Sequence, residues 1–224
     1  MTAEPRYAEL HAHSAFTFLE GTDEPADMVA QASRLGLDAL AILDVDGMYS
    51  TVQTTMAARA AGLPIVYGAE LTLVSDALRG IAAGSSAPGW GLAPGAEDPG
   101  MRLPILAASP RGYGNLVGAM SERALNEPGQ RHPRHDLVNL SEAGGGLVAL
   151  TGGRRGPLMR ALRAGGALSA RRVLDVLVDA FGRDHVLVEW QGARGDEDEV
   201  GEVLAELARA SGTRMVATSG GGQS

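Results

Sequence analysis

The chain of 224 residues contains no cysteine, so disulfide bonds and thiolate metal ligands are both excluded. It also lacks any apolar run of roughly 18 residues, the length that a membrane-spanning helix needs. The first ten residues, MTAEPRYAEL, have no apolar core of the kind found in signal peptides. From these absences we expect a soluble cytoplasmic protein without a membrane partner.

Basic residues are fewer than acidic ones: the chain has 19 Lys and Arg residues and 27 Asp and Glu residues, which gives a formal net charge of -8. Affinity for nucleic acid rests on neutralising phosphates, so most of this surface should repel DNA. A local cluster could still contact DNA, and it consists of Arg154, Arg155, Arg160 and Arg163. A solvated helix face is the favoured interpretation of this cluster, and we expect contact with DNA only through a partner.

Short apolar runs alternate with segments of helical periodicity along most of the chain. Strands are predicted at Tyr7–Leu10, Ala39–Leu43, Ile65–Tyr67, Leu103–Ala107, Leu147–Leu150, Val186–Trp190 and Met215–Thr218, and Glu70–Val74 is predicted to be extended. Helices are predicted from Pro25 to Gly36, at Ser50–Ala61 with Gly62 as its stop, and near 114–125, 157–163, 169–181 and 197–210. This alternation predicts an α/β fold with a mostly parallel sheet, and about seven strands favour a barrel.

Two segments interrupt the pattern. Residues from about 75 to 102 are rich in Gly, Ala and Pro and are predicted to form a flexible insertion. The segment RHPRHD, which contains His132 and His135, is predicted to be a solvated loop. His185 precedes a strand, at the opposite end from a strand-end site, and is not a candidate ligand.

Residues that can bind metals follow the first three strands. His11 and His13 alternate on an extended segment, so both side chains should point the same way and could hold zinc, manganese or iron. Asp44 and Glu70 offer carboxylates at the next two strand ends, and Glu20 could fold back over the site. Each also has a structural interpretation: packing or surface histidines, a helix cap at Asp44, an exposed strand residue at Glu70, and a turn residue at Glu20.

These segments resemble a known family. YAELHAHSAFTFLEG, DALAILDVDGMYS and LPIVYGAELTL are similar to the N-terminal PHP (polymerase and histidinol phosphatase) domain of bacterial DNA polymerase III alpha subunits, in the error-prone branch. The resemblance continues to ARASGTRMVATS and omits the insertion. It implies one domain over residues 1–224, folded as a distorted seven-stranded (β/α)7 barrel with ligands at the carboxyl ends of the strands, and it leaves no room for the polymerase domains.

The resemblance implies metal-ligand positions at His11, His13, Glu20, Asp44 and Glu70. Several other family ligands are replaced, which predicts a partly degenerate site. Val45 and Arg102 stand where the family has histidines, and Gly153 stands where it has a cysteine. The last strand leads only to Ser219–Gly222, where the family has a further ligand histidine. We therefore expect one divalent ion (zinc, manganese or iron) or none.

Three functions remain open at this point. The first is a structural domain that supports an error-prone polymerase in replication or translesion repair, with the polymerase core or other repair proteins as partners. The second is a free-standing metal-dependent phosphoesterase or 3′–5′ exonuclease that uses the residual site. The third is an interaction module of a larger repair complex. If no metal is bound, replacing His11 with alanine should leave thermal stability nearly unchanged.

Overall fold

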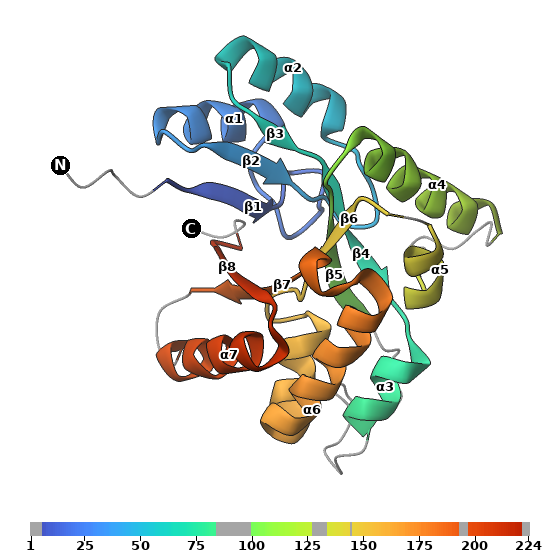
Figure 1. Ribbon diagram of the computed structural model, residues 1–224. Helices are drawn as coiled ribbons and strands as arrows, with labels where there is room; N and C mark the ends of the chain where they lie inside the picture. Colours follow the sequence, from blue (N-terminus) through green and yellow to red (C-terminus); the bar gives the residue numbers. More distant parts are fainter. Residues whose placement is uncertain (1–5, 84–99, 127–133, 144, 193–196, 221–224) are drawn as a thin grey trace.

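The computed structural model describes residues 6–83, 100–126, 134–143, 145–192 and 197–220, and strands alternate with helices along them (Figure 1). The strands are β1 (Ala8–Ala12), β2 (Ala39–Ile42), β3 (Ile65–Val66), β4 (Gly68–Leu73), β5 (Met101–Ala107), β6 (Leu147–Leu150), β7 (Val186–Gln191) and β8 (Arg214–Thr218). The helices are α1 (Pro25–Arg34), α2 (Thr51–Ala61), α3 (Asp76–Ala83), α4 (Pro110–Asn126), α5 (Leu137–Glu142), α6 (Pro157–Phe181) and α7 (Glu197–Ser211). The predicted α/β class is therefore confirmed.

The strands form two sheets. The first contains β1, β2 and β3 in that order, all parallel, and the second contains β4 to β8 in sequence order. In the second sheet β5 is antiparallel to both of its neighbours, whereas β6, β7 and β8 are parallel. An isolated bridge between Val45 and Glu70 joins the first sheet to the second.

The predicted closed barrel of seven mostly parallel strands is not confirmed. Only Tyr67 separates β3 from β4, and the strands divide into the two sheets at this point, with the parallel Val45–Glu70 bridge as the link between them. Closure would need a ladder between β1 and β8, and none forms among the described residues. Instead the Ser219 backbone N–H donates to the Glu9 carboxylate at 2.8 Å, so polar side chains hold this seam.

The hydrophobic core consists of three clusters of buried residues that pack against the sheets. The largest fills the space between the five-stranded sheet and helices α3 to α7, with Leu103, Leu174 and Leu177 fully buried. A second cluster, which includes Val29 and Leu40, packs α1 and α2 against the three-stranded sheet. A third lies between the two sheets and consists of Ala41, Leu43, Leu106 and Leu150. Because both sheets are held through this third cluster, their strand ends face each other in a fixed geometry.

Local sequence signals set most helix boundaries. α1 begins at Pro25 and is followed by Gly36 at φ 69°, and α2 ends at Gly62, also at φ 69°. These left-handed conformations favour glycine, as the predicted stops require. α6 contains non-helical residues at Gly165 and Gly166, so it consists of the two helical parts that the sequence predicts. No helix in the described part of the chain is long and apolar enough to cross a membrane.

One local prediction needs correction. The segment predicted as a flexible insertion is ordered at both ends, because α3 occupies 76–83 with Leu78 buried and β5 begins at Met101, while residues 84–99 lie outside the described residues. α2 is buried through Thr54 and Ala58, whereas Val52 and Met56 on its outer face are 69% and 70% exposed.

Candidate metal centre

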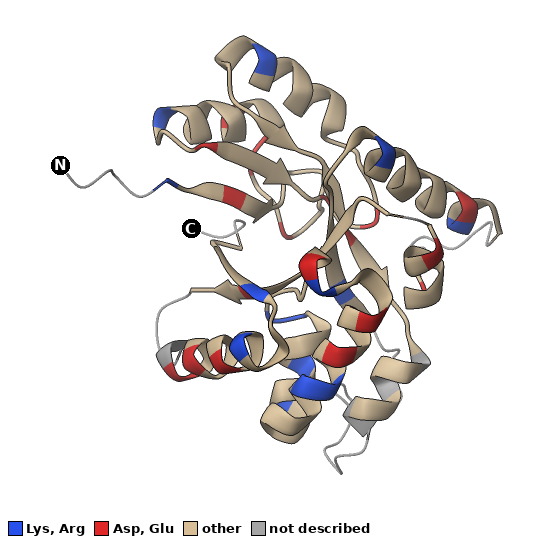
Figure 2. Cartoon of the chain, in the orientation of Figure 1, with Lys and Arg blue, Asp and Glu red and all other residues tan. Residues whose placement is uncertain are grey.

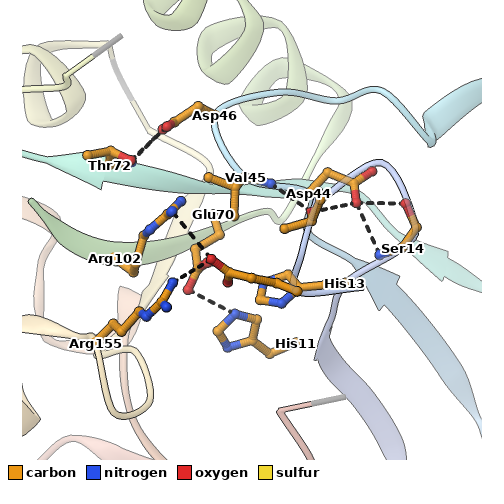
Figure 3. Close-up of polar contacts among 12 residues, drawn as sticks. His11, His13, Ser14, Asp44, Val45, Asp46, Glu70, Thr72, Arg102 and Arg155 are labelled. Atoms are coloured by element: carbon orange, nitrogen blue, oxygen red, sulfur yellow. Dashed lines mark hydrogen bonds and ion pairs between the residues drawn. The ribbon is translucent and has the colours of Figure 1, made fainter. Parts of the chain in front are cut away.

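His11 and His13 stand at the carboxyl end of β1, and both side chains reach Glu70 on β4 (Figure 3). The Nε2 atom of His11 lies 3.2 Å from one Glu70 oxygen, and the Nε2 atom of His13 lies 3.2 Å from the other. The two rings are perpendicular, with centroids 5.1 Å apart. The alternation of side chains along an extended segment therefore brings both imidazoles to one side, as the sequence predicts.

This trio has the properties of a divalent metal site. Its three ligand atoms lie within 4.8 Å of one another. Two ligands bound to zinc at about 2.1 Å in tetrahedral geometry are roughly 3.4 Å apart, close to the spacing seen here. Both Nε2 atoms are buried and have no hydrogen-bond partner among the described residues. Buried orphan nitrogens that converge on a carboxylate fit a cation, and a His₂Glu set suits zinc, manganese or iron.

Glu189 on β7 belongs to the same cluster, and the sequence analysis did not single it out. Its Oε1 atom lies 2.7 Å from Nδ1 of His11, on the side of the ring opposite Glu70. The Glu189 carboxylate is completely buried and also accepts a hydrogen bond from the Thr218 hydroxyl at 2.5 Å. The signal available in the sequence is a charged residue inside the apolar strand VLVEW, which buries a carboxylate that must be paired.

Burial and ion pairing oppose each other in the pKa values of this cluster. Burial would lower the pKa of His11, but Glu189 and Glu70 raise it well above its ordinary value. Burial would raise the pKa of Glu70, yet the nearby imidazoles of His11 and His13 lower it. The pKa of Glu189 is also lowered, because the opposing effect of burial is outweighed mainly by His11. These shifts describe the cluster without a metal ion, and a cation would compete with protons for the histidine nitrogens.

The structure places Asp44 differently from the trio. Its side chain accepts hydrogen bonds from the Ser14 backbone and hydroxyl, from the Thr17 hydroxyl and from the Ser50 backbone, at 2.7–3.2 Å. Asp44 is 1% exposed, so these donors surround the carboxylate. It fixes the loop after β1 to the loop after β2 and is not grouped with His11, His13 and Glu70.

Glu20 is paired with two arginines. Its carboxylate lies 3.7 Å from the Arg102 guanidinium on β5 and makes a closer ion pair with Arg155. Arg102 and Arg155 flank the trio (Figure 3). Guanidinium groups thus balance the charge of Glu20, so this carboxylate is engaged with protein cations and is not part of the His11–His13–Glu70 group.

Other side chains fill the positions where the resemblance places further ligands. Val45 pairs with Glu70 in the isolated bridge and offers no ligand atom. A Cβ atom on Gly153 would lie 1.7 Å from the Gln191 amide oxygen, so Gln191 occupies the space of a side chain at this position. A Cβ atom on Gly220 would also approach Gln191, at 3.0 Å. Gly221 and Gly222 lie outside the described residues.

The predicted solvated loop that contains His132 and His135 has a different outcome at His135. His135 is not solvated: it is 2% exposed, and its backbone pairs with Thr72 and Val74 at 2.8 Å, because the loop returns beside β4. His132 lies outside the described residues, and His185 is exposed before β7, as expected.

The arginine cluster does not form one helix face. Arg154 and Arg155 precede α6 and are exposed, and Arg155 pairs with Glu20 at the candidate metal centre. Only Arg160 and Arg163 stand on the helix, and the Arg163 guanidinium donates to the Arg154 carbonyl at 3.1 Å. Acidic residues are interspersed with the basic ones along α6, and α7 is mainly acidic (Figure 2).

Together these features define a class of protein: an α/β domain whose strand ends present a His/Glu cluster suited to a divalent metal ion. The chain belongs to the PHP domain family, whose model matches residues 9–193.

Several similar proteins are error-prone DNA polymerases. The polymerase of Mycolicibacterium paratuberculosis is 41% identical over 216 residues, and that of Cutibacterium acnes is 41% identical over 218 residues. The matches cover 96% and 95% of this chain but 18% of each relative. The chain thus spans under a fifth of the length of these polymerases.

Solved structures support the fold. An amidohydrolase from Chromobacterium violaceum matches with a TM-score of 0.60 and 16% identity, over 96% of this chain and 87% of that protein. A protein from Bifidobacterium adolescentis, described as a candidate metal-dependent phosphoesterase, matches with a TM-score of 0.57 and 17% identity, over the same shares. At such low identity these matches establish the shared architecture only.

Proposed function

We propose that this chain is the N-terminal PHP domain of an error-prone DNA polymerase III alpha-subunit-like protein, which acts in cytoplasmic DNA replication or translesion repair. In this proposal the domain holds one divalent metal ion at His11, His13 and Glu70 and has a mainly structural role. Its partners are the polymerase core and other replication or repair proteins, and it contacts DNA only through them. The identity to error-prone polymerases over nearly the whole chain supports this assignment.

One observation carries the structural role: the positions where the resemblance places further ligands are occupied by other side chains. Val45, the paired Arg102 and Arg155, and the Gln191 amide surround it. Phosphoester hydrolysis by clustered metals needs several ions to activate water and to balance the charge of the phosphate. A single ion in this setting stabilises the seam between the two sheets and supports little hydrolysis.

The residual trio also favours a second candidate, a metal-dependent phosphoesterase or 3′–5′ exonuclease. When bound, a metal ion held by two histidines and a carboxylate can lower the pKa of a coordinated water. In that case His11, His13 and Glu70 would hold the ion, while Arg102 and Arg155 would supply positive charge for a phosphate. Their pairing with Glu20 opposes this role, because an incoming phosphate would compete with a carboxylate already in place.

Metal analysis together with activity separates these functions. The purified chain is loaded with zinc or manganese, and its metal content is measured by elemental analysis beside a His13→Ala variant. We expect one ion per chain, a lower content in the variant, and no metal-dependent hydrolysis of p-nitrophenyl phosphate or of a 3′-mismatched primer. Two or three ions with hydrolysis that the variant loses would establish the phosphoesterase instead.

The proposed supporting role is tested with the polymerase part that follows the PHP domain in an error-prone DNA polymerase. The chain is co-expressed with a polymerase fragment that begins where the similarity to this chain ends. We expect the two to copurify and the fragment to become more heat-stable. A fragment that folds and melts identically without the chain would contradict a supporting role.

A further inference from the structure

His11 lies between two buried carboxylates that approach opposite nitrogens of its ring. Glu189 is 2.7 Å from Nδ1, and Glu70 is 3.2 Å from Nε2. Only the first contact has hydrogen-bond geometry, since Nε2 has no hydrogen-bond partner among the described residues. The two ring nitrogens of His11 therefore differ: Nδ1 is hydrogen-bonded to Glu189, and Nε2 points into the candidate metal centre.

A strong acceptor at Nδ1 determines where the ring carries its proton. When a neutral imidazole donates Nδ1–H to a carboxylate, the lone pair is left on Nε2. In a neutral His11 that lone pair would face Glu70 and lie beside His13. A carboxylate behind a ligand histidine also fixes the angle of the ring and makes the ligand nitrogen more basic.

The position of Glu189 is itself fixed by neighbouring residues. The Thr218 hydroxyl on β8 donates to Oε1 at 2.5 Å, and the Gln191 amide donates to the same oxygen at 3.2 Å. The Glu189 backbone N–H donates to the Thr151 hydroxyl at 2.9 Å, which holds the strand next to β6. Because the carboxylate is completely buried, water does not compete for its contact with His11.

We propose that Glu189 is a positioning residue for metal binding: it holds His11 with Nδ1 protonated and directs Nε2 at the ion shared with His13 and Glu70. This inference rests on the proposed single-metal site and assigns a role to a residue outside the three ligands. It makes metal affinity depend on β7 and β8 of the five-stranded sheet, although His11 is on β1 of the other sheet.

Glu9 provides a matched control for a purely structural role. Like Glu189 it is a buried carboxylate at the seam between the sheets, with 5% exposure. It accepts hydrogen bonds from the His11 backbone N–H at 2.8 Å and from the Ser219 backbone N–H at 2.8 Å, so it touches His11 without touching the ring nitrogens. Replacing Glu9 by glutamine therefore perturbs the seam but leaves the imidazole contact intact.

The experiment measures zinc affinity by competition with a chromophoric chelator for the wild-type chain, Glu189→Gln, Glu9→Gln and Thr218→Val. We expect Glu189→Gln to weaken zinc binding by about 10- to 100-fold, the usual effect of losing such a partner. Thr218→Val, which keeps the side-chain volume and removes the donor to Glu189, should weaken binding by a smaller factor. Glu9→Gln should bind zinc nearly as tightly as the wild type.

Long-range ¹H–¹⁵N correlation spectra of the zinc-loaded wild-type chain give a second measurement that needs no variant. We expect His11 to show a protonated Nδ1 and a zinc-bound Nε2. Zinc on Nδ1 would overturn the inference, since Glu189 would then compete with the ion, and so would equal affinities for Glu189→Gln and Glu9→Gln. A wild-type chain that binds no zinc would overturn the metal site of the proposed function as well, so the two failures are distinguishable.

Discussion

Val45 and Glu70 form an isolated parallel bridge: the Asp46 N–H donates to the Glu70 carbonyl at 2.8 Å, and the Glu70 N–H donates to the Asp44 carbonyl at 3.2 Å. Bridged residues present their side chains on the same face of the pair. The position where the resemblance places a histidine is thus beside the carboxylate that the trio retains. In the proposed single-metal site, the backbone at this position is in place, and valine offers no ligand atom.

Replacing Val45 by histidine should therefore restore a ligand next to Glu70. We expect zinc affinity to rise at least tenfold. Losing a residue that only contacts a metal ligand already weakens metal binding by about tenfold or more, and a new direct ligand should contribute at least as much. Chelator competition measures the affinity, and Val45→Leu controls for the change in volume. Equal affinities for the wild type and Val45→His would show that the side chain at this position does not face the ion.

His11→Ala should destabilise the metal-free protein, which reverses the expectation from the sequence. His11 is buried between Glu70 and Glu189, and removing the imidazole takes from both buried carboxylates the cation that they share, although His13 still contacts Glu70 and Thr218 still contacts Glu189. Breaking a buried ion pair in this way costs roughly 3–5 kcal/mol of unfolding free energy. Urea unfolding in the presence of a chelator measures this loss, with the exposed His185→Ala as the control. A stability equal to that of the wild type would mean that His11 carries no charge in the metal-free state.

Asp44→Ala separates a structural carboxylate from a ligand. The substitution leaves the buried donors of Ser14, Thr17 and Ser50 without their acceptor, so the free energy of unfolding should fall by about 3 kcal/mol. Zinc affinity of the folded variant should stay at the wild-type value, because Asp44 lies outside the trio. The half-buried Asp38→Ala, which removes an ion pair with Arg6, serves as the comparison for stability. A large loss of zinc affinity in Asp44→Ala would assign it as a ligand.

His135 should make stability depend on mildly acidic pH. Burial lowers its pKa, Arg123 lowers it further, and Asp46 raises it in part. In the folded state His135 therefore stays neutral at pH values where the unfolded chain, with a pKa near 6.5, binds a proton. The unfolding free energy contributed by this residue falls as pH decreases below about 6.5, by up to roughly 1.4 kcal/mol per pH unit, until the folded pKa is reached.

The measurement compares urea unfolding at pH 7.5 and pH 5.5 for the wild type and His135→Gln. We expect a smaller difference between the two pH values in the variant, since glutamine does not titrate and the other groups are unchanged. The same substitution at the exposed His185 provides the control. An identical pH dependence in His135→Gln and the wild type would contradict the assignment.

Local sequence patterns were sufficient to predict several features of this protein. The alternation of strands and helices, the glycine stops of α1 and α2, and the common direction of His11 and His13 all follow from interactions within a few residues along the chain. Glu70 was chosen as a candidate ligand because it follows the strand predicted at Ile65–Tyr67, although in the structure it lies within β4. Such features depend on backbone geometry and on the period of the side chains, which the sequence states directly.

Tertiary structure alone decided how the sheets meet and what surrounds the trio. The strands divide into two sheets at Tyr67, and neither Glu189 nor Gln191 has a local signal that assigns it to the space around His11. Whether a carboxylate serves a metal, an arginine or a set of backbone donors depends on residues far away in the chain, as Glu20 and Asp44 show. The sequence by itself determined the family and the candidate residues, and packing between the two sheets determined which of them converge on one point.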